Sequence, residues 1–160
     1  MKKETLKRIF DFLEEKENKI PKYKRTLTWK IMLNYPLTEE DLNFKGNLDL
    51  YKSKIKSLPK GLKISGYLHL YKTKITSLPE GLKVGGSLDL RGQKKITSLP
   101  DDLQVGGELN IIGCDAITSL PKGLEVGKIL YIKYTPLTKY SDEELREMIK
   151  PGFIKGEIVR

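Results

Sequence analysis

The residues of this chain give little support for catalysis by a nucleophile and a general base. His69 and Cys114 are the only histidine and the only cysteine, and they lie in different copies of a repeated segment. Stacked repeats would place them on the order of 10 Å apart, which is too far for a nucleophile and its general base. The sequence has no phosphate-binding loop, zinc-ligand spacing or nucleotide-binding fingerprint. We therefore predict a protein that is not an enzyme, with no catalytic residue and no cofactor.

One trio of residues could hold a charge or a metal. Asp49, His69 and Asp89 recur at the spacing of the repeat, so they are expected on consecutive strands with the histidine between two carboxylates. A flat ladder lacks the convergent geometry of a metal site, and a salt-bridged histidine explains the trio as well. We therefore predict no metal site.

These residues are positioned by an internal repeat. The phrase ITSLPEGLKVGGSLDL returns as ITSLPDDLQVGGELNI, and four copies of 20, 20, 21 and 21 residues begin at Gly46, Gly66, Gly86 and Gly107. A partial copy covers residues 128–140. A half-copy precedes the first full one, because Leu42 and Phe44 stand 20 residues ahead of Leu62 and Ile64.

The aligned copies contain six columns of apolar residues, which begin in the first copy at Leu48, Leu50, Ile55, Leu58, Leu62 and Ile64. One coil cannot bury its own apolar side, but stacked coils turn each column into a ladder inside a shared core. Side chains alternate along a strand, so each L-x-L motif predicts a short strand with both leucines inward. The L-x-V motif is a candidate second strand. The Gly-Gly pair after it is expected to turn through the positive φ that glycine tolerates.

Over about Leu42 to Tyr140 the coils resemble leucine-rich repeats of the short bacterial type, on the phrase LTSLP and the later L-x-V strand. This resemblance implies an α+β repeat fold, a right-handed solenoid of about 20-residue coils with parallel β-ladders. The family usually places Asn after the L-x-L strand. Here that position holds other residues, so we expect a different bend: Ser53, Thr73, Gln93, Cys114 and Thr135.

The pattern TSLP-x-GL-x-VGG-x-L-x-L, with the later SDEELREMI and GFIKGEIVR, is similar to repeat proteins encoded by bacteriophages. That similarity implies an inhibitor of a host protein, such as a defence protein of the CRISPR effector kind. It also implies the host cytosol as the place of action.

The two ends of the chain are expected to cap the solenoid. We predict an N-terminal cap over residues 1–45, repeats over residues 46–140 and a C-terminal cap over residues 141–160, together one structural domain. Apolar residues at helical spacing predict a helix over residues 3–19: Leu6, Ile9, Phe10 and Leu13. Alternation from Tyr23 to Leu33 predicts a half-buried strand. A capping-box sequence at Ser141 and Glu144 predicts a helix over residues 142–150, and FIKGEIV predicts a closing strand.

The outward positions of the strands are rich in tyrosine and arginine, which are enriched in binding hot spots. We predict a protein-binding face made of Asp49, Tyr51, Tyr67, His69, Tyr71, Asp89, Arg91, Asn110, Tyr131 and Lys133. The alternative is an ordinary solvated face, because tyrosine favours strands in any case.

The chain is basic, with 30 Lys and Arg against 21 acidic residues and a net charge of +9. A lysine stripe is expected along the bend after the strands: Lys52, Lys54, Lys72, Lys74, Lys94 and Lys95. It could follow a phosphate backbone, so a nucleic-acid-binding protein is the alternative function. A solvated lysine edge is the other explanation, because the stripe contains no arginine.

One cysteine excludes an intrachain disulfide framework and is typical of a reducing compartment. Acidic residues interrupt the apolar part of the N-terminal segment, and no apolar run approaches the roughly 20 residues that span a bilayer. We predict a cytoplasmic protein with a protein partner and no membrane contact. The sequence leaves the identity of the partner and the oligomeric state open.

Overall fold

A computed structural model describes residues 26–160 of the chain. The chain divides into two compact units, Met1–Pro36 and Leu37–Arg160. The helix predicted over residues 3–19 lies outside the described residues.

In the first unit, the predicted strand is wrong over the residues that are described. Helix α2 (Leu27–Met32) forms there, and the Thr26 side chain caps it by accepting a hydrogen bond from the backbone N–H of Trp29 at 3.3 Å. The apolar alternation covers only a few residues, and so short a pattern does not separate a strand from a helix. The side-chain cap satisfies a backbone donor that a helix start leaves open, which favours the helix. Residues 23–25 of the predicted strand lie outside the described part.

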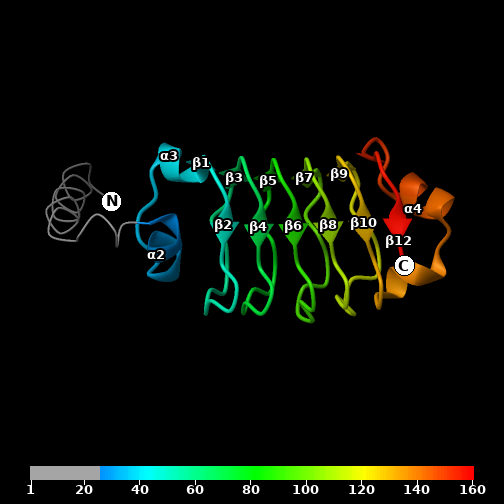
Figure 1. The fold of residues 1–160 in the computed structure, drawn as a ribbon, viewed down its shortest axis with the longest axis horizontal. Coiled ribbons are helices and arrows are strands. Elements are labelled where there is room, and N and C mark those ends of the chain that lie inside the picture. The colour runs from blue at the N-terminus through cyan, green and yellow to red at the C-terminus, as the bar shows by residue number, and fades with distance from the viewer. Residues whose placement is uncertain (1–25) are drawn as a thin grey trace, which may run out of the picture. The chain divides into compact units, whose positions relative to one another are not determined.

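The second unit is a β-solenoid in which successive coils stack side by side (Figure 1). Each coil contributes one two-residue strand to each of two parallel six-stranded sheets. The first sheet contains β1 (Asn43–Phe44), β3 (Lys63–Ile64), β5 (Lys83–Val84), β7 (Gln104–Val105), β9 (Glu125–Val126) and β11 (Phe153–Ile154). The second contains β2 (Leu48–Asp49), β4 (Leu68–His69), β6 (Leu88–Asp89), β8 (Leu109–Asn110), β10 (Leu130–Tyr131) and β12 (Ile158–Val159).

The register of the strands follows the repeat. Phe44 pairs with Ile64 and Leu48 with Leu68, so the half-copy and the second strand of each coil are confirmed. All members of the six apolar columns are buried between the sheets and the remaining side of each coil. Burying a leucine or isoleucine side chain contributes about 1.5–3 kcal/mol, so the columns stabilise the stack.

At the bend after the second sheet, other side chains make hydrogen bonds at the position where leucine-rich repeats usually have Asn. Gln93 Nε2 donates to the carbonyl of Leu70 at 2.5 Å, and Cys114 Sγ donates to the carbonyl of Leu90 at 3.0 Å. Both donors therefore reach a carbonyl of the preceding coil and tie neighbouring coils together. Two threonines donate to a carbonyl of their own coil, at 2.9 and 2.7 Å: Thr73 and Thr135.

The C-terminal segment completes both sheets. Helix α4 (Asp142–Met148) begins with the predicted capping box, in which Ser141 and Glu144 each accept from the backbone N–H of the other. The closing segment forms two strands, β11 and β12, where a single strand was expected. The guanidinium of Arg146 donates to the backbone carbonyls of two residues that flank the turn between these strands: Ile154 and Gly156.

Two short helices were not predicted: α3 (Glu39–Leu42), which Thr38 caps, and the 3-10 helix η2 (Pro136–Lys139). Within residues 26–160, every helix is too short or too polar to cross a bilayer.

Candidate protein-binding face on the second sheet

The outward face of the second sheet holds the predicted trio in register. Asp49 pairs with His69, and His69 pairs with Asp89, on three neighbouring strands. His69 Nδ1 lies 3.4 Å from Asp49 Oδ1, and His69 Nε2 lies 3.3 Å from Asp89 Oδ2. The Nε2 atom is enclosed, and its contact has the distance of an ion pair without the alignment of a hydrogen bond. The imidazole therefore lies between two carboxylates, as the spacing indicated.

Arg91 is held in one orientation by Asp89. Its Nε donates to both carboxylate oxygens at 3.0 Å, and Nη2 donates to Oδ2 at 2.6 Å. These hydrogen bonds raise the pKa of Arg91 above its ordinary range, against the opposing effect of burial. The bidentate contact fixes the plane of the guanidinium, which lies 5.5 Å from the ring of Tyr71.

Aromatic rings and ammonium groups continue from this point into the first two coils. The Tyr51 ring stacks on His69 at 5.4 Å and on Tyr71 at 5.7 Å. Lys52 Nζ lies 4.9 Å from the Tyr51 ring, and Lys72 Nζ lies 5.1 Å from the Tyr71 ring. We call these residues, together with Arg91, the cationic-aromatic cluster: Tyr51, Lys52, His69, Tyr71, Lys72 and Arg91.

Some residues of the predicted face contact one another in the structure, and others do not. Tyr67 is 42% exposed and lies two residues before His69 in the chain, immediately ahead of β4. Asn110, Tyr131 and Lys133 belong to later coils, and within the described part of the chain they make no ring or ion-pair contact with the cluster. Asn110 instead accepts from the backbone N–H of Ile112 at 3.1 Å, which stabilises its own turn.

Two lysines join the predicted face to the lysine stripe. Sequence reasoning assigned Lys52 and Lys72 to the stripe, yet their ammonium groups lie over tyrosines of the face. The position of each lysine directly after its tyrosine was the signal that could have revealed this contact. The face and the stripe are therefore one continuous surface in the first two coils.

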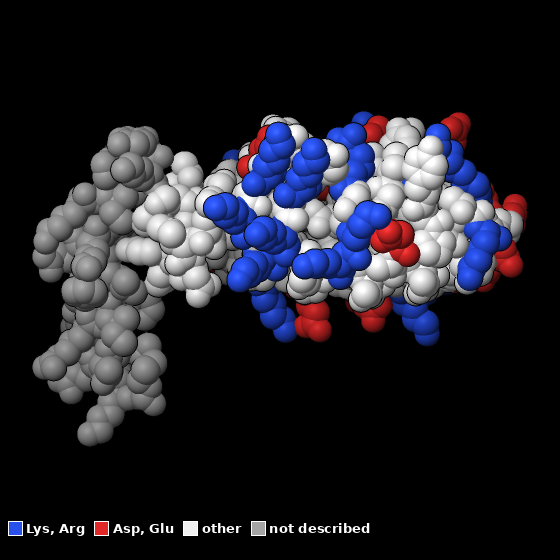
Figure 2. All heavy atoms as spheres, turned by 90° about the horizontal axis from the view of Figure 1, so that it is seen from below, with Lys and Arg blue, Asp and Glu red and all other residues white. Residues whose placement is uncertain are grey.

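All six stripe lysines are exposed, and Figure 2 shows basic side chains gathered over the coils that carry β2, β4 and β6. Lys94 pairs with Asp115 at 2.8 Å, and this hydrogen bond raises the pKa of Lys94. The other five stripe lysines have no ion pair with any described residue: Lys52, Lys54, Lys72, Lys74 and Lys95. The first two coils therefore present basic groups that no residue of 26–160 neutralises.

The residue that follows the tyrosine in these coils has an unusual backbone. Lys52 and Lys72 have φ of 56° and 59°, in the left-handed region that side chains rarely adopt. The equivalent positions of the next two coils hold Gly92 and Gly113, with φ of 66° and 71°. The bend requires this conformation in every coil, and two of the coils meet it with glycine.

Cys114 does not share a site with His69. Its side chain is fully buried in the core, whereas His69 lies on the outward face of the second sheet. Burial raises the pKa of the Cys114 thiol to about 11. Among residues 26–160, no three His, Cys, Asp or Glu side chains are arranged to hold a metal ion.

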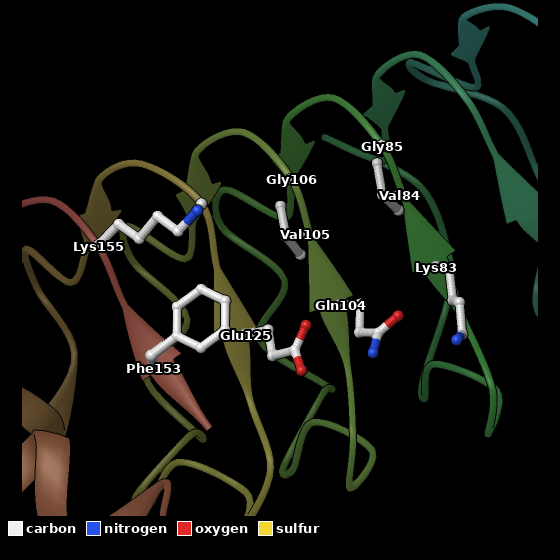
Figure 3. Close-up of a pocket in the computed structure, with 10 residues that line it drawn as sticks. Lys83, Val84, Gly85, Gln104, Val105, Gly106, Glu125, Phe153 and Lys155 are labelled. Carbon is white, nitrogen blue, oxygen red and sulfur yellow. The ribbon is translucent and has the colours of Figure 1, made fainter. Parts of the chain in front are cut away.

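A hollow of about 310 Å³ lies on the outward side of the first sheet (Figure 3). Gly85, Gly106 and Gly127 lie along it, and Phe153 and Lys155 border its C-terminal end. Contrary to the expectation from sequence, neither Gly85 nor Gly106 has a positive φ. A Cβ on Gly106 would lie 2.3 Å from the carbonyl oxygen of Gly85, and one on Gly127 would lie 2.1 Å from that of Gly106. The glycines are therefore required for close stacking of the coils, and the hollow follows from their missing side chains.

Comparison of the chain with models of protein families, with curated proteins and with solved structures finds no match.

Proposed function

We propose that this protein is a non-enzymatic binding module that holds a protein partner on the outward face of its second sheet. The observation that carries the proposal is the cationic-aromatic cluster, in which the exposed Tyr51, the half-buried Tyr71 and the exposed Arg91 lie together in the first three coils. Tyrosine and arginine are the side chains that most often carry the affinity of protein interfaces. Repeat proteins also use the exposed faces of their solenoids for binding.

The cluster is ordered before any partner arrives. Asp89 fixes Arg91 through both carboxylate oxygens, and Tyr71 lies between the Tyr51 ring and the Arg91 guanidinium. Association normally loses the free energy needed to immobilise such side chains. Because these side chains are already held, that loss is small, which supports a role in recognition.

Affinity capture on the immobilised protein, followed by mass spectrometry, would identify the partner. The experiment that then tests the proposal measures its affinity for variants of the face. Removing Tyr67, Tyr71 or Arg91 is expected to cost about 1–3 kcal/mol of binding free energy. Tyr134→Ala is a matched control, because Tyr134 is 71% exposed but belongs to a late coil. Unchanged affinity in all three face variants would contradict the proposal.

The alternative is a nucleic-acid-binding protein, which is favoured by the stripe lysines that have no ion pair with a described residue. In that case, neutralising Lys52, Lys54, Lys72 and Lys74 would abolish binding while Tyr71→Ala and Arg91→Ala left it unchanged. The logarithm of the affinity would also fall steeply with the logarithm of the salt concentration. For a protein partner, the lysine changes would mainly slow association.

We also infer that the coils belong with the leucine-rich repeats and wind in the right-handed sense, which is the usual hand of crossovers between parallel strands. The ITSLP phrase and the ladder of buried leucines support this inference. A cap role for residues 141–160 is supported by the buried Leu145 and Ile149. The phage-type pattern of the repeats supports a host-defence protein, such as a CRISPR effector, as the partner. An interference assay in cells that express this chain would test that role.

A further inference from the structure

We propose that the segment of the partner bound by this face is acidic, and that Lys52 and Lys72 bind its carboxylates beside the rings of Tyr51 and Tyr71. The inference rests on the proposed protein-binding function and adds the chemistry of the partner.

The charges of the cluster are the first argument. The two carboxylates of the face are already engaged within the chain: Asp49 accepts from the backbone N–H of Tyr51 at 2.9 Å and contacts His69, and Asp89 binds Arg91. The lysines beside them have no acidic partner among the described residues, unlike Lys60 and Lys94 elsewhere on the solenoid. The surface open to a partner is therefore positive, and it is complementary to carboxylates.

The backbone gives an independent argument. Lys52 and Lys72 occupy left-handed positions at which two later coils have glycine and the fifth coil has Tyr134. A lysine is disfavoured in that conformation, whereas glycine adopts it freely. Strained residues of this kind cluster at functional sites, so the two lysines are candidates for residues kept for binding. Both lysines also lie over tyrosines of the cluster, Tyr51 and Tyr71.

The same contacts favour an acidic protein segment over a nucleic acid. Asp89 occupies the Nε and Nη2 edge of the Arg91 guanidinium, so that edge is not free to bind a phosphate or a base. The rings of Tyr51 and Tyr71 stack on each other, and Tyr51 also stacks on His69, so one side of each tyrosine ring is closed to a base. Ammonium groups beside tyrosine rings remain suited to a carboxylate next to an apolar side chain.

The test compares three fluorescent probes of equal length: deca-glutamate, deca-glutamine and a ten-nucleotide oligothymidine. Fluorescence anisotropy is measured at low ionic strength, about 50 mM, where surface charges are weakly screened. The key variant carries Lys52→Gly and Lys72→Gly, which keeps the backbone conformation and removes both ammonium groups. The control carries Lys63→Gln and Lys83→Gln, which removes two exposed lysines from the first sheet. A second variant with Lys52→Asn and Lys72→Asn separates charge from glycine flexibility, because Asn tolerates the left-handed conformation.

We expect the parent protein to bind deca-glutamate more tightly than oligothymidine and not to bind deca-glutamine. Both lysine variants should lose roughly 10-fold or more in affinity for deca-glutamate, and the control should lose less than about 3-fold. The glycine variant should unfold at a temperature no lower than that of the parent, so that the loss reflects binding and not misfolding.

Three results would overturn the inference: tighter binding of oligothymidine, no binding of deca-glutamate by the parent, or equal losses in the lysine variants and the control. Capture of a protein that depends on Tyr71, without binding of deca-glutamate, would leave the proposed function intact and reject only the acidic segment. Capture that is unchanged in the Tyr67, Tyr71 and Arg91 variants would reject the proposed function itself.

Discussion

Gly106→Ala should destabilise the solenoid far more than its small change in size suggests. The new Cβ would lie 2.3 Å from the carbonyl oxygen of Gly85, and normal contacts exceed 3.0 Å, so the two coils must separate by about 0.7 Å. That movement stretches the hydrogen bonds from Gly106 N to Val84 O at 2.8 Å and from Gly107 N to Gly86 O at 2.9 Å. Loss of two such bonds, with the added overpacking, costs about 2–5 kcal/mol.

Gly61→Ala is the matched control for this prediction. Gly61 has φ of +73°, and no atom lies within 4 Å of an added Cβ, so alanine there meets only the backbone preference. That preference costs about 1–2 kcal/mol. Urea unfolding followed by far-ultraviolet circular dichroism gives both free energies, and amide hydrogen exchange reports whether protection is lost around β5 and β7. Equal effects of the two substitutions would refute the claim that coil contact requires Gly106, and the hollow of the first sheet would then need another explanation.

Three further predictions address the core and the C-terminal end. The Cys114 thiol, with its pKa raised from 9.0 to about 11, should resist alkylation near neutral pH until the protein unfolds. The folded state holds the thiol proton more tightly than the unfolded state does. The parent should therefore lose stability relative to Cys114→Ser only as the pH rises above about 9, measured as urea midpoints. A difference in midpoint between the two proteins that stays constant up to about pH 11 would contradict this. Arg146→Ala should cost about 2–3 kcal/mol of unfolding free energy, because two carbonyls of the last coil lose a charged donor, and Arg146→Lys should recover only part of it. Leu88→Ala and Val105→Ala should each cost about 1–4 kcal/mol in chemical denaturation, and unchanged midpoints in both would contradict the buried columns.

The repeat by itself determined the architecture of the second unit. A residue such as Leu68 recurs at one period with its neighbours Leu48 and Leu88, and only stacked coils bury such columns. The same spacing predicted that Phe44 is equivalent to Ile64 and that His69 lies between two acidic residues, and both are observed. These features follow from periodicity alone, because a parallel stack aligns equivalent positions of successive copies.

Outside the repeat, local patterns were less informative. The alternation around Trp29 was compatible with a strand, but the Thr26 cap and the burial of Leu27 belong to a helix. The closing segment after Pro151 was read as one strand and supplies two. A short segment without copies has no second instance to establish its period, so its structure depends on the caps and neighbours that it finds.

Only the tertiary structure decided which side chains of the face contact one another. It showed that Asp89 binds Arg91 through both oxygens and that Lys94 has an acidic partner. Lys52 and Lys72 lie over tyrosines and have no acidic partner within residues 26–160. It also showed why the Gly-Gly pairs are glycine, since that reason is a carbonyl of the preceding coil and not a backbone angle. The physical reason is common to these cases. Periodicity specifies which positions share a rung, whereas ion pairs, ring stacking and steric contact depend on distances of a few ångströms between side chains and backbone of different coils.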